Sequence, residues 1–169
     1  MDLVIKKATW ADVPAIHEIT QLAFKKYADD LGLPDQVTAL KETEEMIYQE
    51  LQTKTILIAF LNGKPVGSIR YEFLTENVVY ISRFGVRPDI QNKGIGRALI
   101  LAVEEEVKQK GATLITLHTA SKITSLIRFY YGMGFYIHST STDRGYRRAL
   151  LCKELEEENS LPLDVVNMK

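Results

Sequence analysis

Apolar residues along the chain switch between two spacings, and the switches divide the chain into strands and helices. Residues 3–8 alternate as a strand does, and residues 13–24 then carry apolar side chains at helical spacing. Between them, Thr9 and Asp12 form a T-x-x-D capping box, which is typical of a helix start. A stretch with glycine and proline interrupts the pattern before helical spacing returns over residues 40–53. The first third of the chain therefore predicts one strand and two helices.

The middle of the chain predicts an antiparallel sheet. Three runs rich in β-branched and aromatic residues follow one another at 55–61, 65–74 and 78–86. Asn62 and Gly63, between the first two runs, form the dipeptide that a two-residue hairpin turn favours. We therefore expect these three strands to be antiparallel neighbours.

The last part of the chain predicts a crossover followed by a hairpin. An amphipathic helix over 94–110 connects the strand at 78–86 to another at 113–119, and a crossover of this length implies that the two strands are parallel. The remaining segments predict a short helix and two strands, at 124–134, 135–142 and 146–155.

Composition and charge limit the class of protein. The 169 residues are 46% hydrophobic and 25% charged, with a formal net charge of −1, which fits a soluble domain and offers no general attraction to nucleic acid or to an anionic membrane. No apolar run approaches the roughly 20 residues of a membrane span, and no signal-like segment begins the chain, so we expect a cytoplasmic protein. We expect one domain over residues 1–155 and a surface tail over 156–169, whose apolar residues leave a homodimer open.

The stretch VRPDIQNKGIGRAL, which joins the third strand of the middle group to the amphipathic helix, predicts an anion site. A helix start carries unpaired backbone N–H groups and a partial positive charge. Gly94 and Gly96 remove side chains from this helix start, and Lys93 and Arg97 add positive charge beside it. A phosphate or pyrophosphate is the ligand that this combination favours.

Two common phosphate-binding motifs do not fit this stretch. A Walker loop needs G-x-x-x-x-G-K-[ST], but Gly94 is followed by Ile95 and Gly96. A dinucleotide fingerprint needs a third glycine or alanine where this chain has Leu99. It also belongs to a parallel sheet, whereas the strands expected before this stretch are antiparallel. A simpler interpretation, in which the two glycines only ease a tight turn into a helix, stays open from these residues alone.

The same stretch resembles a known family. Residues 91–96, QNKGIG, match the Q/R-x-x-G-x-G/A signature of the GNAT superfamily of N-acetyltransferases, and residues 129–135, FYYGMGF, are similar to that family's F-Y-x-x-x-G-F. The order of elements extends the resemblance over about residues 3–155. It implies an α/β (α+β) fold: a mixed, mostly antiparallel sheet of six to seven strands, whose central parallel pair splays apart for coenzyme A, flanked by about four helices.

The resemblance implies that acetyl-CoA is the acetyl donor. The helix start then binds the pyrophosphate through backbone N–H groups, and the pantetheine arm follows the strand end, where Gly85 permits a bulge. Many relatives carry an asparagine where this chain has Ile123, so that contact is absent or is replaced by Ser121, Thr124 or Ser125. The implied cofactor-binding residues are Phe84, Gly85, Val86, Gln91, Asn92, Lys93, Gly94, Ile95, Gly96, Arg97 and Ser125.

The resemblance also implies a general acid. Tyr130 falls at the family's tyrosine, where a phenol that keeps its proton at pH 7 can give it to the departing thiolate. The structural alternative is that Tyr130 only packs.

The general base is less defined in this sequence. Some relatives carry a glutamate on the fourth strand where this chain has Tyr80. Glu72 on the preceding strand is a candidate substitute, with Tyr80 and Ser82 sharing one strand face that could hold a water. His118 is a further candidate, although a structural histidine is the commoner case. Arg83 either pairs with Glu72 or contacts substrate.

The acceptor is predicted to be a primary amine of a small molecule or peptide. In the family the acceptor enters over the first two helices and the last hairpin, where this chain offers aromatic and acidic residues that suit a cationic amine, unless the charges belong to a solvated helix face. His17 and His138 have no partner at ligand spacing, so we expect no metal. The substrate residues expected from the aromatic and polar groups of these regions are Tyr27, Tyr80, Ser82 and Tyr146.

Three functions fit these observations. The first is an acetyl-CoA-dependent N-acetyltransferase that works by direct attack of the amine. The second is a catalytically silent module of the same fold that senses acyl-CoA. The third is an unrelated phosphate-binding domain.

Overall fold

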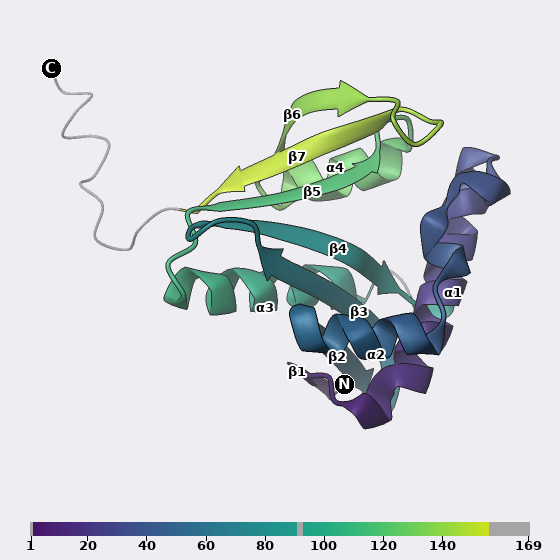
Figure 1. The fold of residues 1–169 in the computed structure, drawn as a ribbon, viewed down its shortest axis with the longest axis vertical. Helices are drawn as coiled ribbons and strands as arrows, with labels where there is room; N and C mark the ends of the chain where they lie inside the picture. The colour runs from purple at the N-terminus through teal and green to yellow at the C-terminus, as the bar shows by residue number, and fades with distance from the viewer. Residues whose placement is uncertain (1, 91–92, 156–169) are drawn as a thin grey trace, which may run out of the picture.

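A computed structural model describes residues 2–90 and 93–155, and its central feature is one twisted sheet (Figure 1). The sheet order is β1-β2-β3-β4-β5-β7-β6, and every neighbouring pair is antiparallel except β4 with β5. This confirms the predicted mixed sheet with one parallel pair. The strands are β1 Leu3–Lys7, β2 Thr55–Leu61, β3 Lys64–Phe73, β4 Val78–Val86, β5 Leu114–Ala120, β6 Tyr136–Ser141 and β7 Arg148–Glu154.

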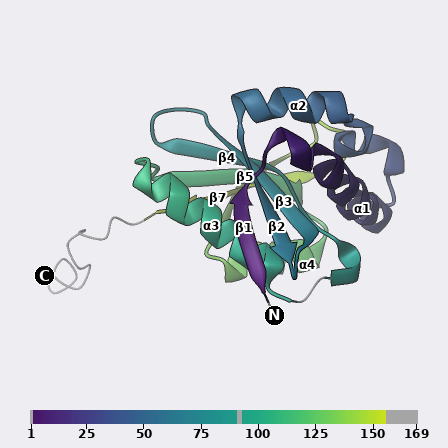
Figure 2. The same ribbon diagram turned by 90° about the horizontal axis from the view of Figure 1, so that it is seen from below.

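Helices cover both faces of the sheet. Figure 2 shows α1 and α2 on one face and α3 and α4 on the other. The predicted capping box is present before α1, where Asp12 Oδ2 accepts a hydrogen bond of 2.8 Å from the Thr9 N–H. The α-helices are α1 Val13–Leu31, α2 Glu44–Thr53, α3 Ile95–Gln109 and α4 Thr124–Gly132.

Strand β2 shows why the chain buries two apolar layers. Its side chains alternate between faces, so Ile56 and Ile58 join the cluster under α1 and α2, while Leu57 and Ala59 join the larger cluster under α3. All four are at most 4% exposed. Each fully buried aliphatic side chain of this size stabilises the fold by roughly 1.5–3 kcal/mol, so both helical layers are held through the same strand.

Both helices before the sheet differ from their predicted bounds. Helix α1 continues past residue 24 to Leu31, because no breaker occurs before Gly32, whose φ of 70° ends the helix. Helix α2 begins at Glu44 instead of residue 40, because the Thr43 hydroxyl accepts a hydrogen bond from the Met46 N–H and caps it there. Local capping chemistry, which the apolar spacing does not report, sets both ends.

The predicted hairpin between β2 and β3 is confirmed. Asn62 and Gly63 have φ angles of 51° and 81°, the two positive values that a type I′ turn requires. No helix in the described ranges, 2–90 and 93–155, combines the length and the apolar character needed to cross a membrane. The predicted tail over 156–169 lies outside the described residues.

Helix α1 approaches β4 so closely that glycine is required at the contact. A Cβ added to Gly85 would lie 2.7 Å from the Ala23 Cβ, a separation that real Cβ atoms essentially never show. Since both atoms belong to the main framework and neither is the end of a flexible side chain, the helix would have to move. Gly85 therefore fixes the distance between α1 and β4.

This contact gives a first prediction. Gly85→Ala should lower the free energy of unfolding by about 1–3 kcal/mol, the usual cost of overpacking a core, as measured by urea denaturation. Adding Ala23→Gly should restore most of the stability that Gly85→Ala loses, once the cost of a glycine within a helix, about 1 kcal/mol, is subtracted. A double-mutant cycle measures this coupling. Gly132→Ala is the matched control, since a Cβ there meets nothing within 4 Å. Additive effects of Gly85→Ala and Ala23→Gly would contradict the prediction.

Candidate active site

The two parallel strands of the sheet separate after a short pairing. Residues Val78 to Ile81 of β4 pair with Leu114 to Leu117 of β5, and no pairing follows. Strand β5 keeps its partner β7 as far as Ala120, while β4 stays with β3 (Figure 1). A cavity of about 810 Å³ lies at the divergence, so the site occupies the opening between two halves of one sheet.

A bulge in β4 accompanies the divergence. Ser82 pairs with Arg70 and Gly85 with Ser68, so two residues of β4, Arg83 and Phe84, lie opposite a single residue of β3. The positive φ, 49°, falls on Arg83. The sequence predicted a bulge that Gly85 permits; the bulge lies directly before Gly85, which itself pairs with Ser68 and has a separate role in the contact with α1. A bulge leaves backbone groups without ladder partners, and both bulge residues, Arg83 and Phe84, line the cavity.

The end of the cavity beside α3 has the features of an anion site. Gly94 is the N-cap of α3 with a φ of 77°, and the N–H groups of the following turn have no partner within the helix. A Cβ at Gly96 would lie 3.3 Å from the Phe84 ring and 3.6 Å from the Phe129 ring. Gly96 therefore lets two aromatic rings lie against the helix start, in addition to leaving room for a ligand.

The structure brings most of the predicted cofactor residues together at this cavity. Lys93 is exposed and is not part of the lining, and Gln91 and Asn92 lie outside the described residues. Ile123 is the N-cap of α4 and makes no side-chain capping bond. The predicted cofactor residues that line the cavity are Phe84, Gly85, Val86, Gly94, Ile95, Gly96, Arg97 and Ser125.

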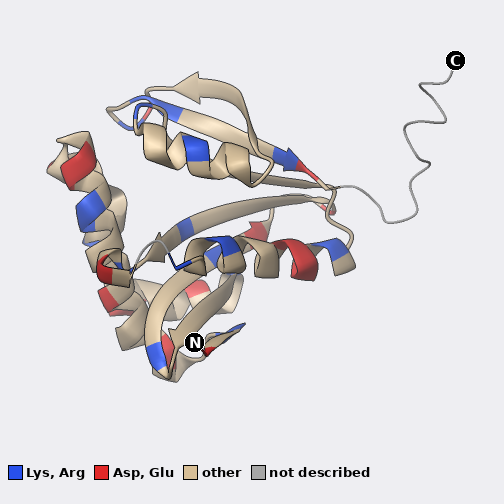
Figure 3. Cartoon of the chain, turned by 180° about the vertical axis from the view of Figure 1, so that it is seen from behind, with Lys and Arg blue, Asp and Glu red and all other residues tan. Residues whose placement is uncertain are grey.

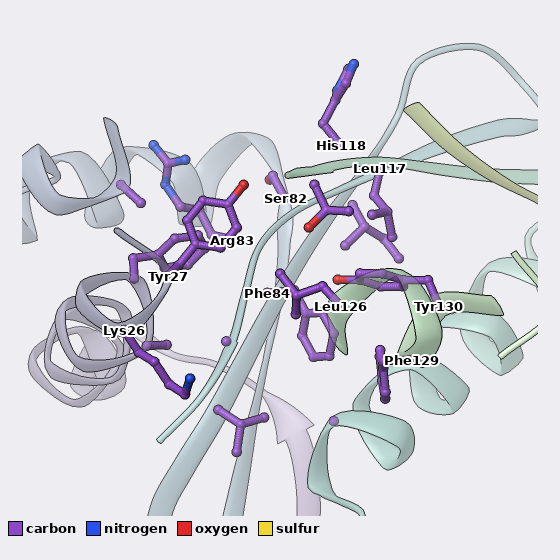
Figure 4. Close-up of a pocket in the computed structure, with 18 of the residues that line it drawn as sticks. Lys26, Tyr27, Ser82, Arg83, Phe84, Leu117, His118, Leu126, Phe129 and Tyr130 are labelled. Atoms are coloured by element: carbon purple, nitrogen blue, oxygen red, sulfur yellow. The ribbon is translucent and has the colours of Figure 1, made fainter. Parts of the chain in front are cut away.

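Tyr130 lies in an aromatic cluster on the α4 side of the cavity. Its ring is 5.2 Å from that of Phe129 and 5.6 Å from that of Phe135, both nearly perpendicular to it. Burial raises the pKa of the Tyr130 phenol above its ordinary value, which keeps the hydroxyl protonated over the whole neutral range. Figure 4 shows this hydroxyl directed toward β4 at Phe84, so Tyr130 packs and also presents its proton to the cavity.

The opposite side of the cavity carries the predicted acceptor residues. Tyr27 of α1 and Tyr146, just before β7, join hydroxyl groups at 3.2 Å, and Figure 4 places Tyr27 across the cavity from Tyr130. Ser82 also lines the cavity, and its buried hydroxyl has no hydrogen-bond partner in the part of the chain that the structure describes. All four predicted acceptor residues, Tyr27, Tyr80, Ser82 and Tyr146, belong to the cavity lining.

Tyr80 is bonded to the one histidine of the cavity lining. Its hydroxyl lies 2.7 Å from Nδ1 of His118. Desolvation and the nearby charge of Arg148 lower the pKa of His118 below its ordinary value, against a weaker opposite effect of Asp143. Figure 4 shows the His118 side chain directed away from Tyr130, as strand alternation after Leu117 requires. The imidazole is therefore neutral at pH 7 and stands apart from the phenol.

Glu72 lies outside the cavity. Its carboxylate pairs with Lys54 at 3.1 Å, and Glu72 is not part of the cavity lining, although it lies opposite Tyr80 in the β3–β4 ladder. Arg83, which the sequence allowed to pair with Glu72, instead lies 3.4 Å from Glu42. Regular alternation after Ser82 would turn Arg83 toward the face under α3, and the bulge instead lets its side chain reach Glu42.

Beside the cavity the protein buries an ion pair that sequence analysis missed. Both guanidinium ends of Arg70 bind the Glu42 carboxylate, at 2.6 and 2.7 Å, and Glu50 adds a contact of 3.2 Å. Burial raises the pKa of Glu42, but the hydrogen bonds and charges of Arg70 and Arg83 together lower it below its ordinary value. The signal in the sequence was an arginine within an apolar strand, which predicts a buried partner but does not say which carboxylate supplies it.

No group of three or more metal-ligating side chains occurs among residues 2–90 and 93–155. The site as described therefore consists of a helix start, a strand bulge, a buried phenol and a histidine–tyrosine pair.

Comparison with known proteins assigns the family. The family model described as Acetyltransferase (GNAT) family matches residues 14–135, which is more than half of the chain. The chain belongs to the GNAT acetyltransferase family. The matched range includes both glycines of the loop and Tyr130, and the family is one of acetyltransferase enzymes.

Individual GNAT relatives are distant in sequence. An uncharacterised N-acetyltransferase of Chlorobaculum tepidum is 25% identical over 134 residues, 79% of this chain and 76% of that protein. Spermidine N(1)-acetyltransferase of Thermoplasma acidophilum is 22% identical and covers 83% of this chain and 92% of that protein. The crystal structure of the PaiA N-acetyltransferase from Thermoplasma acidophilum, in complex with coenzyme A, has a TM-score of 0.82 at 20% identity, covering 92% of this chain and 100% of that one. The fold is thus that of the family.

The buried ion pair gives a second prediction. Arg70→Met removes both short hydrogen bonds from the buried Glu42 carboxylate and leaves it only the longer contact with Arg83, so it should lower the free energy of unfolding by about 3–5 kcal/mol. Replacing Glu42 by Leu in the same protein should recover at least half of that loss, since no unpaired charge is then left at that position. Lys26→Met, which breaks the exposed pair with Asp30, serves as control and should cost less than about 1 kcal/mol. Urea denaturation measures all three; a loss below 1 kcal/mol for Arg70→Met would contradict the prediction.

Proposed function

We propose that this GNAT protein transfers an acetyl group from acetyl-CoA to a primary amine of a small molecule or peptide. The observation that carries the proposal is the single cavity, which joins a helix N-terminus at Gly94 to a buried phenol at Tyr130 through the opening between β4 and β5. A pyrophosphate, an extended thiol arm and a thioester need these three features in that order. The coenzyme A complex of the PaiA N-acetyltransferase, which shares the fold, supports the same ligand.

The residues fit coenzyme A in two respects. The N–H groups after Gly94 and the guanidinium of Arg97 suit the pyrophosphate, since both are cationic or partly so and both border the cavity. The backbone of β4 from Phe84 to Val86 has lost β5 as a neighbour and can bond the amides of the pantetheine arm. Once bound, the coenzyme supplies the acetyl thioester.

Tyr130 acts as the general acid. The acceptor amine attacks the thioester carbonyl, the carbon–sulfur bond breaks, and the sulfur leaves as a thiolate that takes the phenol proton. Backbone N–H groups freed by the bulge at Arg83 are the donors available to the carbonyl oxygen. A solvent proton restores the phenol, whose raised pKa makes it protonated before every turnover.

His118 acts as the general base, in place of Glu72. With the proton of the neutral imidazole on Nδ1, that atom donates to the Tyr80 oxygen and Nε2 is free to accept the amine proton, directly or through a water. His118 lines the cavity and is neutral, whereas Glu72 is held by Lys54 outside it. Base and acid then lie on opposite sides of β5, which keeps incoming and outgoing protons apart.

The acid role of Tyr130 gives a third prediction. Tyr130→Phe should lower kcat by about 10²–10⁴-fold, the usual contribution of a general acid, and should leave the dissociation constant of acetyl-CoA within about threefold of wild type. Thiol release over a panel of amines measures kcat, and isothermal titration measures binding. Tyr131→Phe, at an exposed neighbour on the same helix, is the control.

Three other outcomes would contradict parts of the proposal. Loss of acetyl-CoA binding in Tyr130→Phe would show that the residue only packs. Binding of acetyl-CoA by the wild type without acetylation of any amine would show an acyl-CoA sensor. Binding of ATP but not of acetyl-CoA would show a different phosphate-binding domain.

The base role of His118 gives a fourth prediction. Because its pKa is lowered, kcat/KM should stay constant as pH falls from 8 toward the ordinary histidine value of about 6.5, and should decline only below it as the imidazole takes a proton. His118→Gln should lower kcat at least tenfold and remove that decline. His138→Gln, on the exposed strand β6, is the control and should keep the wild-type profile. An unchanged acid limb in His118→Gln would exclude this base.

A further inference from the structure

Arg148 is a buried charge that the mechanism above does not use. It is the first residue of β7, faces the cavity and is only 8% exposed, whereas its neighbour Arg147 is exposed and bonds the Thr140 hydroxyl. Of these two adjacent arginines, strand alternation directs Arg148 toward the acceptor end of the site. Burying a guanidinium is costly unless its donors are satisfied.

The donors of Arg148 are only partly satisfied. Its Nη2 lies 3.5 Å from Asp143, whose side chain is 62% exposed, and this is a long contact with a solvated carboxylate. Its Nε is buried and has no hydrogen-bond partner among residues 2–90 and 93–155. A buried arginine normally has its fork filled by a carboxylate. Arg148 lines the cavity, and the described residues take up only part of its donor capacity.

The two carboxylates of the cavity lining, Asp30 and Glu50, are already paired. Asp30 binds Lys26 at 2.8 Å. Glu50 binds Lys54 at 3.0 Å and also contacts Arg70. Each of these two carboxylates therefore already has a cation beside it, which weakens the case for a polyamine-like acceptor.

Positive charge at the acceptor end is in excess. Arg144 also lines the cavity and bonds the Thr38 hydroxyl, with no carboxylate among its described partners. Figure 3 shows basic residues gathered at the end of the β6–β7 hairpin nearest α1. Arg148 and Arg144 share this end with Tyr27 and Tyr146, so a cationic corner is bordered by two phenol rings.

We propose that the acceptor is an amine that carries a carboxylate, as a free amino acid does, and that Arg148 binds the carboxylate. The inference rests on the proposed acetyltransferase function and adds the substrate class. A planar carboxylate matches the guanidinium fork and can accept from the terminal nitrogens of Arg148, whose contact with Asp143 is long. Tyr27 and Tyr146 border the side chain of such an acceptor, and His118, near Arg148, takes the proton from its amine. A polyamine would instead place cations against two arginines.

The test compares matched acceptors. Amino acids, their carboxamides, the corresponding decarboxylated amines and spermidine are offered with acetyl-CoA, and thiol release gives kcat/KM for each. The carboxylate should be preferred over the matched carboxamide by about 10- to 100-fold, the range of a charge-assisted hydrogen bond. A readout without turnover accompanies it: in the presence of coenzyme A, N-acetylated amino acids should raise Tm and their amides should not.

Variants locate the effect at Arg148. Arg148→Met should raise KM for the preferred amino acid about 10- to 100-fold, with kcat/KM for the carboxamide within about twofold of wild type and acetyl-CoA affinity unchanged. Arg148→Lys keeps the charge without the fork, so its KM for the amino acid should lie between those of wild type and Arg148→Met. It also keeps the test possible if Arg148→Met does not fold. Arg147→Met is the matched control on the same strand end and should behave as wild type.

The outcomes separate this inference from the proposed function. Better turnover of carboxamides or spermidine than of carboxylates would overturn the inference and leave the acetyltransferase standing. Equal losses on both substrate types in Arg148→Met would also overturn it, because they would indicate a structural role. Acetylation of no amine, with acetyl-CoA bound, would refute the proposed function itself.

Discussion

The separation of β4 from β5 is the constraint on which the rest of this structure depends. Parallel strands that stay paired satisfy each other's backbone groups and leave no room for a ligand. Here the pairing stops after Ile81, where β4 bulges at Arg83 and Gly85 then lets α1 close against the strand. The fold thus leaves backbone groups of β4 without partners from β5 and forms a cavity between two well-packed half-sheets. The left-handed conformation of Arg83 costs on the order of 1–3 kcal/mol.

Two kinds of rigidity support this opening. On one face, α3 packs its apolar side on β3 and β4 and carries Gly94 to the cavity. On the other, the Arg70–Glu42 pair ties β3 to the segment before α2. A buried ion pair adds little net stability compared with apolar packing, but breaking it is expensive. It therefore fixes which charges lie near the acceptor, and it removes Glu42 from the carboxylates available to a ligand.

The donor end of the site could be predicted from the sequence to a greater extent than the acceptor end. The glycines of the loop and Tyr130 lie in local motifs, and a helix start binds anions through backbone groups that need no distant partner. The ion-pair partners of Glu72 and Arg83, which are Lys54 and Glu42, could not be read from the sequence because they come from other elements. The net charge of the acceptor end depends on which of its charged side chains such ion pairs neutralise.

The sequence by itself determined the order of strands and helices, the parallel crossover and the family, because apolar spacing, turn residues and motif spacing are local properties. Only the tertiary structure decided that His118 lies against Tyr80, that the acidic residues near the cavity are neutralised, and that Arg148 is buried with spare donors. These depend on which side chains meet across the sheet. Residues far apart in sequence meet there through the bulge, the divergence and the close approach of α1, which apolar spacing does not encode.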